Sequence, residues 1–192
     1  MERFFFGIPG LMVVAPSDPY TAKGLLKTAI RSQNPVLFFE HKLLYANSGK
    51  VPTEEYLLPL GKARVVRTGN DVTLVTHLLG VGVATDVADR LAQKGIGVEV
   101  IDLCSLYPID TTTILTSVEK TGRLVTVEEG VATGGIGAEV ITRVTTAGIH
   151  MLKRSPLRFG AAECPVPYAK NLENLLLPDV AMIADKIEKE LM

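Results

Sequence analysis

Residues that could carry chemistry stand where predicted strands end. Glu128 and Glu129 close an apolar run, and the glycine-rich turn GVATGGIG (residues 130–137) separates them from a helical pattern. A turn between a strand and a helix is where α/β proteins usually bind phosphates. The dinucleotide spacing G-x-G-x-x-G fails because Val140 replaces its last glycine, and no Lys-Ser/Thr pair follows. We therefore favour a tight turn at a subunit contact, with an anion site as the alternative.

Neither the glutamates nor the three histidines form a recognisable catalytic set. Adjacent residues on a strand point to opposite faces, so Glu128 and Glu129 are not expected to act jointly as acid and base. His41, His77 and His150 are scattered, without Ser-His-Asp order or H-E-x-x-H spacing. We interpret each histidine as structural.

One predicted helix end could hold a cation. The helix opens at Ser17 or Asp18 as N-cap and ends before Asn34-Pro35. Its last carbonyls have no partner within the helix, and the helix macrodipole makes this end negative. Main-chain oxygens near residues 29–34 could therefore hold a monovalent cation. The same helix carries a basic stripe that we interpret as solvated: Lys23, Lys27 and Arg31.

The elements that must position these residues alternate between strand and helix. Strands are predicted at residues 11–15, 36–40, 72–76, 97–103, 123–128 and 157–160, and further helices at 83–94, 110–121, 137–147 and 178–191. This alternation indicates an α/β fold with a mostly parallel sheet and helices on both faces. Glu2 to Phe6 is expected to be the end of a helix.

A polar, irregular stretch around residues 46–62 divides the chain. Before it stands one strand–helix–strand unit, which cannot form a stable sheet alone and needs neighbours. After it, the pattern describes a complete α/β unit.

Composition narrows the function classes. The 192 residues include 20 basic and 21 acidic side chains, and the net charge of −1 excludes the basic footprint of a nucleic-acid or membrane-surface binder. The longest uncharged stretches are too short or too interrupted to cross a bilayer, so we expect a soluble protein. Cys104 and Cys164 fit a reducing compartment and are both interpreted as small buried apolar residues.

Four stretches carry a resemblance: AIRSQNPVLFFEHKLLY (residues 29–45), IDLCSLYPID (101–110), TGRLVTVEEGVATGGIGAE (121–139) and PVPYAKNLE (165–173). Together they resemble the beta subunits of the thiamine-diphosphate-dependent 2-oxoacid dehydrogenases, and most closely those of pyruvate dehydrogenase. The resemblance implies three parts. Residues 1–45 would be the C-terminal part of a pyrimidine-binding domain, residues 46–62 a linker, and residues 63–192 a transketolase-like C-terminal domain.

In that family, pyruvate is decarboxylated on thiamine diphosphate and the two-carbon unit passes to the lipoyl group of an acyltransferase. The glutamate and histidine that the family uses at the cofactor match positions upstream of Met1. The resemblance therefore implies no catalytic and no cofactor-binding residue in this chain, which alone is expected to be inactive. Thiamine diphosphate and Mg²⁺ would be bound by the alpha subunit and by the upstream part of the beta subunit.

The resemblance also implies partners and a metal site. This portion would serve assembly with an alpha subunit and a second beta subunit, and would dock the subunit-binding domain of the dihydrolipoyl acyltransferase. The family's K⁺ site matches the helix end described above, through the carbonyls of Ala29, Ile30, Ser32 and Asn34.

The chain departs from the family at several positions. Cys104 replaces an arginine and removes a charge, and Leu78-Leu79-Gly80 replaces a more polar loop. Arg154 stands where the family has an aspartate, beside Lys153, which changes the charge of the surface expected to dock the acyltransferase. Glu163 and Cys164 replace an aspartate and a valine.

Other functions compete with this one. The nearest alternative is the beta subunit of a branched-chain 2-oxoacid dehydrogenase. A stand-alone, non-catalytic interaction module of the same fold is a second alternative, and a flavodoxin-like nucleotide binder is a weaker third. The expected location is the bacterial cytoplasm, or the plastid stroma or mitochondrial matrix in a eukaryote.

Overall fold

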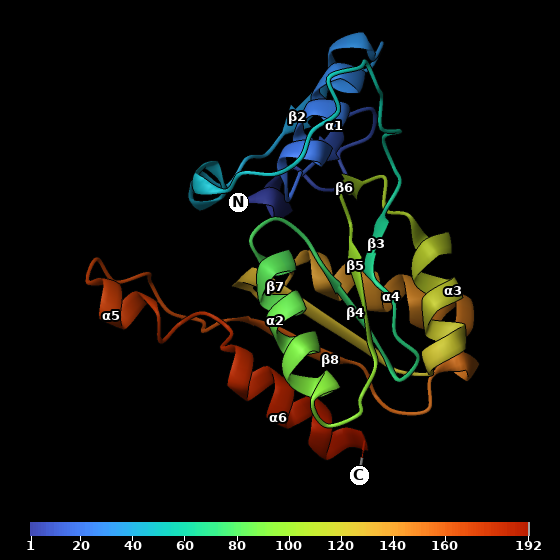
Figure 1. Cartoon of the computed structure of the whole chain (residues 1–192), viewed down its shortest axis with the longest axis vertical. Helices are drawn as coiled ribbons and strands as arrows, with labels where there is room; N and C mark the ends of the chain where they lie inside the picture. The colour runs from blue at the N-terminus through green and yellow to red at the C-terminus, as the bar shows by residue number, and fades with distance from the viewer. Residues whose placement is uncertain (192) are drawn as a thin grey trace.

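The computed structural model describes residues 1–191, which are organised around two sheets (Figure 1). The strands are β1 (Met12–Val14), β2 (Val36–Phe38), β3 (Arg64–Arg67), β4 (Val72–Thr76), β5 (Val98–Asp102), β6 (Ser105–Tyr107), β7 (Leu124–Val131) and β8 (Leu157–Ala161). The smaller sheet has the strand order β2-β1-β6, and the larger sheet has the order β3-β5-β4-β7-β8. The two sheets lie at opposite ends of the long axis of the molecule.

Helices surround the sheets and connect their strands. The α-helices are α1 (Pro19–Arg31), α2 (Gly80–Ala92), α3 (Thr111–Thr121), α4 (Ile136–Gly148), α5 (Lys170–Glu173) and α6 (Val180–Leu191). The 3-10 helices are η1 (Glu2–Phe4), η2 (Lys42–Ala46) and η3 (Ile149–Met151). Within residues 1–191, none of the helices has the length and apolarity that crossing a lipid bilayer requires.

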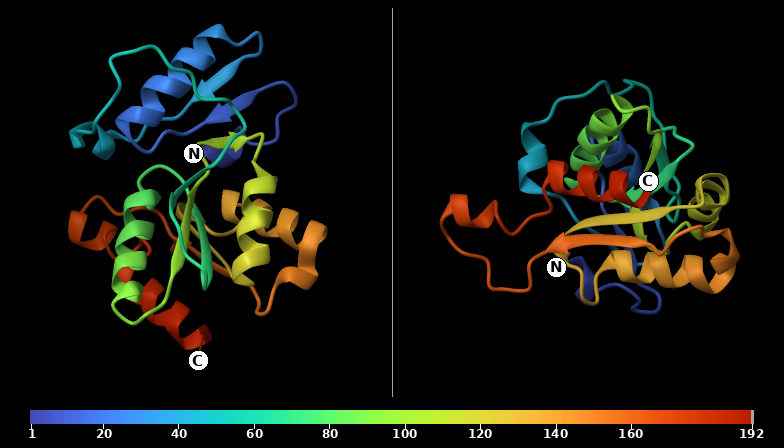
Figure 2. Two further views of the ribbon diagram at one scale, coloured as in Figure 1. Left: turned by 45° about the vertical axis from the view of Figure 1, so that its right-hand side comes forward. Right: turned by 90° about the horizontal axis from the view of Figure 1, so that it is seen from below.

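The larger sheet is mostly parallel and covered on both faces. Strands β5, β4, β7 and β8 are parallel, and β3 runs antiparallel to β5 at one edge. Helices α2 and α6 cover one face, and α3 and α4 cover the other (Figure 1 and Figure 2). Along β4, Val72 and Leu74 face α2 and α6, whereas Val75 faces α3 and α4. The predicted α/β fold with a mostly parallel sheet is confirmed.

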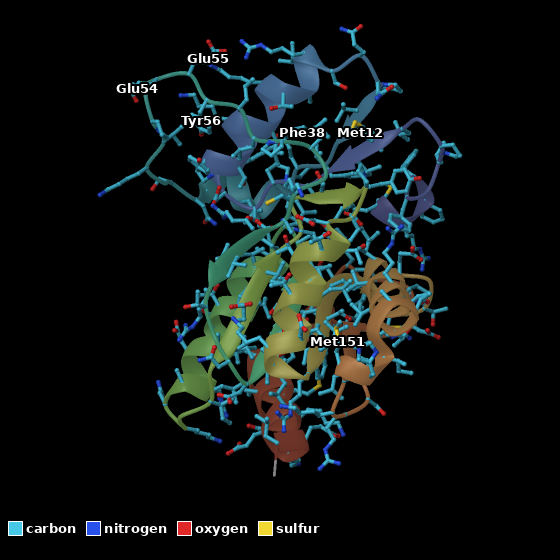
Figure 3. All side chains as sticks on the ribbon, turned by 90° about the vertical axis from the view of Figure 1, so that its right-hand side faces the viewer. Met12, Phe38, Glu54, Glu55, Tyr56 and Met151 are labelled. Atoms are coloured by element: carbon cyan, nitrogen blue, oxygen red, sulfur yellow. The ribbon has the colours of Figure 1, made fainter. Side chains whose placement is uncertain are left out.

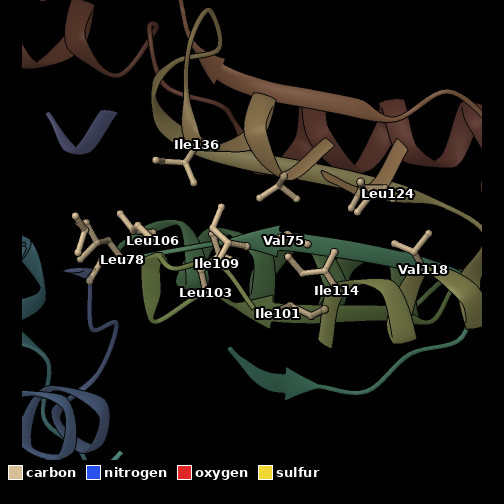
Figure 4. Close-up of a cluster of buried hydrophobic side chains, with 14 residues drawn as sticks. Val75, Leu78, Ile101, Leu103, Leu106, Ile109, Ile114, Val118, Leu124 and Ile136 are labelled. Carbon is tan, nitrogen blue, oxygen red and sulfur yellow. The ribbon is translucent and has the colours of Figure 1, made fainter. Parts of the chain in front are cut away.

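The core beneath α3 and α4 continues into the N-terminal segment. Figure 4 shows Ile114 of α3 beside Val75 and Ile101 of the larger sheet. The same cluster includes Val13 and Ala15, both fully buried. Burying one Val or Ile side chain contributes roughly 1.5–3 kcal/mol. The N-terminal strand–helix–strand unit thus obtains the neighbours that it was predicted to need.

The smaller sheet takes its third strand from the chain that follows β5. Strand β1 pairs in parallel with β2 and antiparallel with β6. The ring of Phe6 meets that of Tyr107 edge-on, with centroids 5.8 Å apart. The sequence pattern did not predict β6 or β3, because each has three or four residues and its pairing depends on a partner far away in the chain.

Local sequence decides where two of the helices begin. Of the two candidate caps for α1, the structure uses Asp18, whose Oδ1 accepts the Thr21 N–H at 2.7 Å. Asp110 accepts the Thr113 N–H at 3.2 Å and caps α3, whose start agrees with the helix predicted at 110–121. Helix α3 ends at Gly122, which has a φ of +71° and so lies in the region that glycine adopts without strain.

Two helix predictions differ from the structure. Glu2–Phe4 forms a single 3-10 turn and not the end of an α-helix. Helix α2 begins at Gly80, three residues before the predicted start. A Cβ at Gly80 would lie 2.1 Å from Thr76 Oγ1, so only glycine lets the helix start this close to β4.

A buried hydroxyl cluster joining β4 to α3 yields a test of the packing. Thr73 Oγ1 lies 2.7 Å from Ser117 Oγ and 2.8 Å from Thr121 Oγ1. Thr73→Val keeps the shape and removes the central hydroxyl, so the other two lose a partner. We expect the free energy of unfolding in urea to fall by about 1–3 kcal/mol. The control is Thr116→Val on the exposed face of α3, where a change below about 0.5 kcal/mol is expected; equal losses would contradict the role of the cluster.

Candidate functional site

The carboxyl ends of β4, β5 and β7 meet at the edge of the larger sheet that faces the N-terminal segment (Figure 1). In open parallel sheets this edge is where ligands bind. A cavity of about 340 Å³ lies here between β7, η1 and residues 161–177. Its acidic lining comes from Glu2, Glu128, Glu129 and Glu173, beside apolar residues such as Leu176.

Glu128 is bound to the start of α4. Its two carboxylate oxygens accept the N–H groups of Ile136 and Gly137, each at 3.0 Å. Burial raises the pKa of Glu128, and these two amides oppose the shift. A Cβ at Gly135 would lie 2.3 Å from Glu128 Oε2, so the glycines let the turn close around the carboxylate. The tight turn is confirmed, whereas the subunit contact stays a prediction, and Glu128 fills the place that a phosphate would take at this helix end.

Glu129 has a different partner from Glu128, although both line the cavity, and it pairs with His41, the N-cap of η2. His41 Nε2 lies 3.1 Å from Glu129 Oε2, while His41 Nδ1 accepts the Leu43 N–H at 3.3 Å. Because Nδ1 is an acceptor, the proton of a neutral imidazole sits on Nε2 and faces the carboxylate. Burial raises the pKa of Glu129, and His41 counters this. The pair therefore joins the N-terminal segment to β7 and leaves no ring nitrogen free to act as a base.

His77 follows β4 and is buried at the same edge. Its relative exposure is 8%, and burial lowers its pKa to about 4, with Glu2 acting in the opposite direction. The next residue, Leu78, has a φ of +51°, a region that a non-glycine residue rarely adopts. The interpretation of His77 as a structural histidine agrees with this neutral, buried placement.

A buried carboxylate at the end of β5 was missed by the sequence reasoning. Asp102 is fully buried and accepts hydrogen bonds from Ser17 Oγ and, at 3.1 Å, from the Cys104 N–H. Arg64 lies 3.8 Å from Asp102 and 2.5 Å from Asp18. Burial raises the pKa of Asp102, and these donors lower it. The available signal was an aspartate standing between Ile101 and Leu103 at the end of the strand sequence VEVIDL.

The two cysteines differ. Cys104 is buried as predicted, has a φ of +53°, and has a pKa that is raised by burial and by the nearby Asp102. Its thiol is therefore held protonated and unreactive. Cys164 is exposed, so its interpretation as a buried apolar residue is wrong. It lines the cavity beside β7, and neither buried core cluster includes it. The segment that carries it reaches outward to α5 (Figure 2).

The predicted cation ligands lie together at the C-terminal end of α1. Ala29 and Ile30 are in its last turn, and Ser32 is the C-cap. The Ser32 N–H donates to the Ala29 carbonyl at 3.1 Å, and the Asn34 N–H donates to Ser32 Oγ at 3.1 Å. The carbonyls of Ile30, Ser32 and Asn34 accept no hydrogen bond from any residue between 1 and 191. Free carbonyl oxygens at a negative helix end suit a monovalent cation.

The basic stripe of α1 is not simply solvated. Arg31 pairs with Glu55, and Lys23 Nζ donates to the Glu54 carbonyl at 3.2 Å. Over the described part of the chain, no group of three His, Cys, Asp or Glu side chains gathers as a metal site would require.

Two families match the chain. The transketolase C-terminal domain matches residues 61–183, and the transketolase pyrimidine binding domain matches residues 1–47.

Curated relatives agree with these matches. The pyruvate dehydrogenase E1 component subunit beta of Rhizobium meliloti is 47% identical over 94% of this chain and 40% of its own. The mitochondrial subunit beta-1 of Arabidopsis thaliana is 45% identical over 92% of this chain and 50% of its own. The beta subunit of an acetoin:2,6-dichlorophenolindophenol oxidoreductase from Cupriavidus necator is 43% identical over 98% of this chain and 56% of its own. The chain thus spans about half the length of the curated relatives it matches.

One solved structure shares the fold. A split-gene transketolase, described as an inactive beta4 tetramer, superposes with a TM-score of 0.79 over 98% of this chain and 60% of its own. Its sequence identity is 24%, so the likeness concerns the fold alone.

Glu128 packs closely against the start of α4. Replacing a glycine by alanine is therefore predicted to destabilise the chain in α4 but to stabilise it in α2. A Cβ at Gly137 would lie 2.9 Å from Glu128 Oε1 and 2.5 Å from Thr126 Oγ1. We expect Gly137→Ala to lower the free energy of unfolding by about 1–3 kcal/mol. In α2, nothing lies within 4 Å of a Cβ at Gly82, and Gly82→Ala is expected to stabilise by about 0.5–1 kcal/mol. Urea unfolding measures both, and stabilisation by Gly137→Ala would contradict the close fit.

The buried His77 predicts a pH dependence of stability. Its ordinary pKa of 6.5 falls to about 4 in the folded chain, so the unfolded chain binds the proton more readily. The contribution of the neutral His77 ring to the free energy of unfolding is fully present above pH 6.5. It is lost as the pH falls toward 4, by roughly 3 kcal/mol at most. His77→Leu is expected to flatten the plot of unfolding free energy against pH between 6.5 and 4.5. The control is His150→Gln at an exposed residue, and an unchanged slope in His77→Leu would contradict the assignment.

Proposed function

The chain belongs to the transketolase C-terminal domain family, and from this premise we propose that it is a portion of the beta subunit of a pyruvate dehydrogenase decarboxylating component. The observation that carries the proposal is the identity of 45–47% with two such subunits over more than nine-tenths of this chain. In this proposal the component decarboxylates pyruvate on thiamine diphosphate and passes the acetyl group to a lipoyl acyltransferase.

The proposed division of the chain follows its two sheets. Residues 1–45 would be the C-terminal part of a pyrimidine-binding domain, 46–62 the linker and 63–192 the transketolase-like C-terminal domain. The irregular course of residues 47–63 supports a linker there. Strand β6 crosses this division, because it lies on the C-terminal side and pairs with β1. The two parts would therefore move as a unit.

Thiamine diphosphate does not fit the residues of this chain alone. The amides at the start of α4 already bind Glu128, whose charge would repel a diphosphate. Residues 1–191 also lack a group of three acidic, His or Cys side chains that could hold Mg²⁺. We therefore assign no step on the cofactor to this chain, and propose that the alpha subunit and other parts of the beta subunit bind it.

A monovalent cation, K⁺ in this proposal, does fit the end of α1. The carbonyls of Ala29, Ile30, Ser32 and Asn34 would hold it, and three of these accept no hydrogen bond from the described residues. Bound there, the cation would stabilise the last turn of α1 and its connection to β2.

The proposed role of this portion is assembly with an alpha subunit and a second beta subunit, and docking of the acyltransferase. Exposed apolar side chains on residues 162–177 support an interface: Val166 is 71% exposed, Leu175 78%, and Tyr168 fully exposed. Lys153 and Arg154 are also exposed, so an acyltransferase partner would need acidic groups opposite them.

Cofactor binding provides the first test. Titration of thiamine diphosphate and Mg²⁺ into the isolated chain is expected to give no heat of binding, because Glu128 occupies the start of α4, the helix that follows the glycine-rich turn. Inorganic pyrophosphate serves as the control ligand for a simple anion site. Tight binding of either ligand without a partner would contradict the proposal.

Reconstitution tests the assembly role. The matching portion of the Rhizobium meliloti beta subunit would be replaced by this chain and expressed with the alpha subunit. We expect a complex that decarboxylates pyruvate faster than branched-chain 2-oxoacids. A folded chimera that captures neither the alpha subunit nor the acyltransferase would favour a non-catalytic module of the same fold.

A further inference from the structure

The extended segment of residues 52–58, here called the strap, lies along α1. Tyr56 stacks on Tyr20 with ring centroids 4.7 Å apart, and its hydroxyl donates to the Tyr20 carbonyl at 2.8 Å. Thr28 Oγ1 donates to the Leu58 carbonyl at 2.7 Å. Figure 3 shows Tyr56 on the strap beside the helix. The strap therefore follows α1 from its first turn toward its last.

Close backbone packing holds the strap in place. A Cβ at Gly24 would lie 2.6 Å from Leu58 Cγ, so only glycine allows this approach. The Leu58 N–H also donates to the Gly24 carbonyl at 3.3 Å. Because these contacts are uncharged, the position of the strap does not depend on the ion pairs that it makes.

The strap also carries charge to the end of α1. Glu55 pairs with Arg31, the last residue of the helix, and both side chains are about half exposed. The Arg31 guanidinium lowers the pKa of Glu55, and Lys27 lowers it further. Lys23 Nζ donates to two carbonyls of the strap. The acidic side chain of Glu55 is therefore the group that offsets the positive charge nearest the helix end.

Arg31 stands within the run of residues whose carbonyls would hold the cation. An unpaired guanidinium there would repel a second positive charge. The uncharged strap contacts lie at residues 20–28, on the N-terminal side of Arg31. Glu55, held on the strap, pairs with this guanidinium and offsets its charge.

We propose that the Arg31–Glu55 pair sets the affinity of the α1 end for a monovalent cation, and that Glu55 acts as a positioning residue. This inference rests on the proposed cation site and deepens it. Glu55 contacts Arg31 and not the cation. When the strap moves away, the free charge of Arg31 weakens cation binding.

The test follows the thermal unfolding midpoint of the chain as KCl replaces choline chloride at constant ionic strength. Binding to the folded chain alone raises this midpoint in a saturable way. We expect Glu55→Gln to raise the K⁺ concentration at half-effect by roughly two- to five-fold, the scale of an exposed charge interaction. Arg31→Gln is expected to leave the K⁺ concentration at half-effect unchanged or to lower it. The double variant, with both Arg31→Gln and Glu55→Gln, is expected to behave like Arg31→Gln alone.

The control is Asp89→Asn, which removes the Arg67–Asp89 pair between β3 and α2, away from α1, and should not change the half-effect. If the unsubstituted chain does not respond to K⁺, both the cation site and its coupling to the strap are wrong. If it responds and Glu55→Gln changes nothing, only the coupling is wrong. If Arg31→Gln weakens K⁺ as much as Glu55→Gln does, the pair acts by holding the helix and not by charge, which also overturns the proposal.

Discussion

Burial of the Asp102 carboxylate at the end of β5 determines how the N-terminal segment sits on the larger sheet. Ser17 and the Cys104 N–H donate to it, and Arg64 lies between it and Asp18. A buried carboxylate without such donors would be strongly destabilising. The start of α1, the turn after β5 and the edge strand β3 must therefore keep fixed positions. The continuous hydrophobic core and the pairing of β1 with β6 both depend on these fixed positions.

The same edge shows how acidic groups at the end of a parallel sheet can serve structure. Glu128 satisfies two amides of α4, which otherwise would need an anion or water. Glu129 binds the one proton-bearing nitrogen of His41 and ties η2 to β7. Both carboxylates keep raised pKa values through burial, yet both are committed to bonds within the chain. In the proposed enzyme, the catalytic groups would then come from the alpha subunit and from other parts of the beta subunit that contact this edge.

At the other end of the N-terminal segment, α1 combines a negative helix terminus with a row of basic side chains. These two features have opposite effects on the binding of a cation, because the carbonyls attract it and Arg31 repels it. The strap resolves the opposition by bringing Glu55 to Arg31 and carbonyls to Lys23. A segment without regular secondary structure thereby decides the electrostatics of a helix end.

The sequence by itself determined the order of the longer helices and of the strands other than β3 and β6, and it narrowed the cap of α1 to Ser17 or Asp18. These features depend on periodicity and on hydrogen bonds between near neighbours, which are readable locally. Tertiary structure alone decided that Glu128 fills the start of α4, that the chain after β5 returns to pair with β1, and that the strap covers the basic stripe. It also decided that Cys164 is exposed. Each of these results depends on how segments far apart in the chain pack together, which residue type and local spacing do not specify.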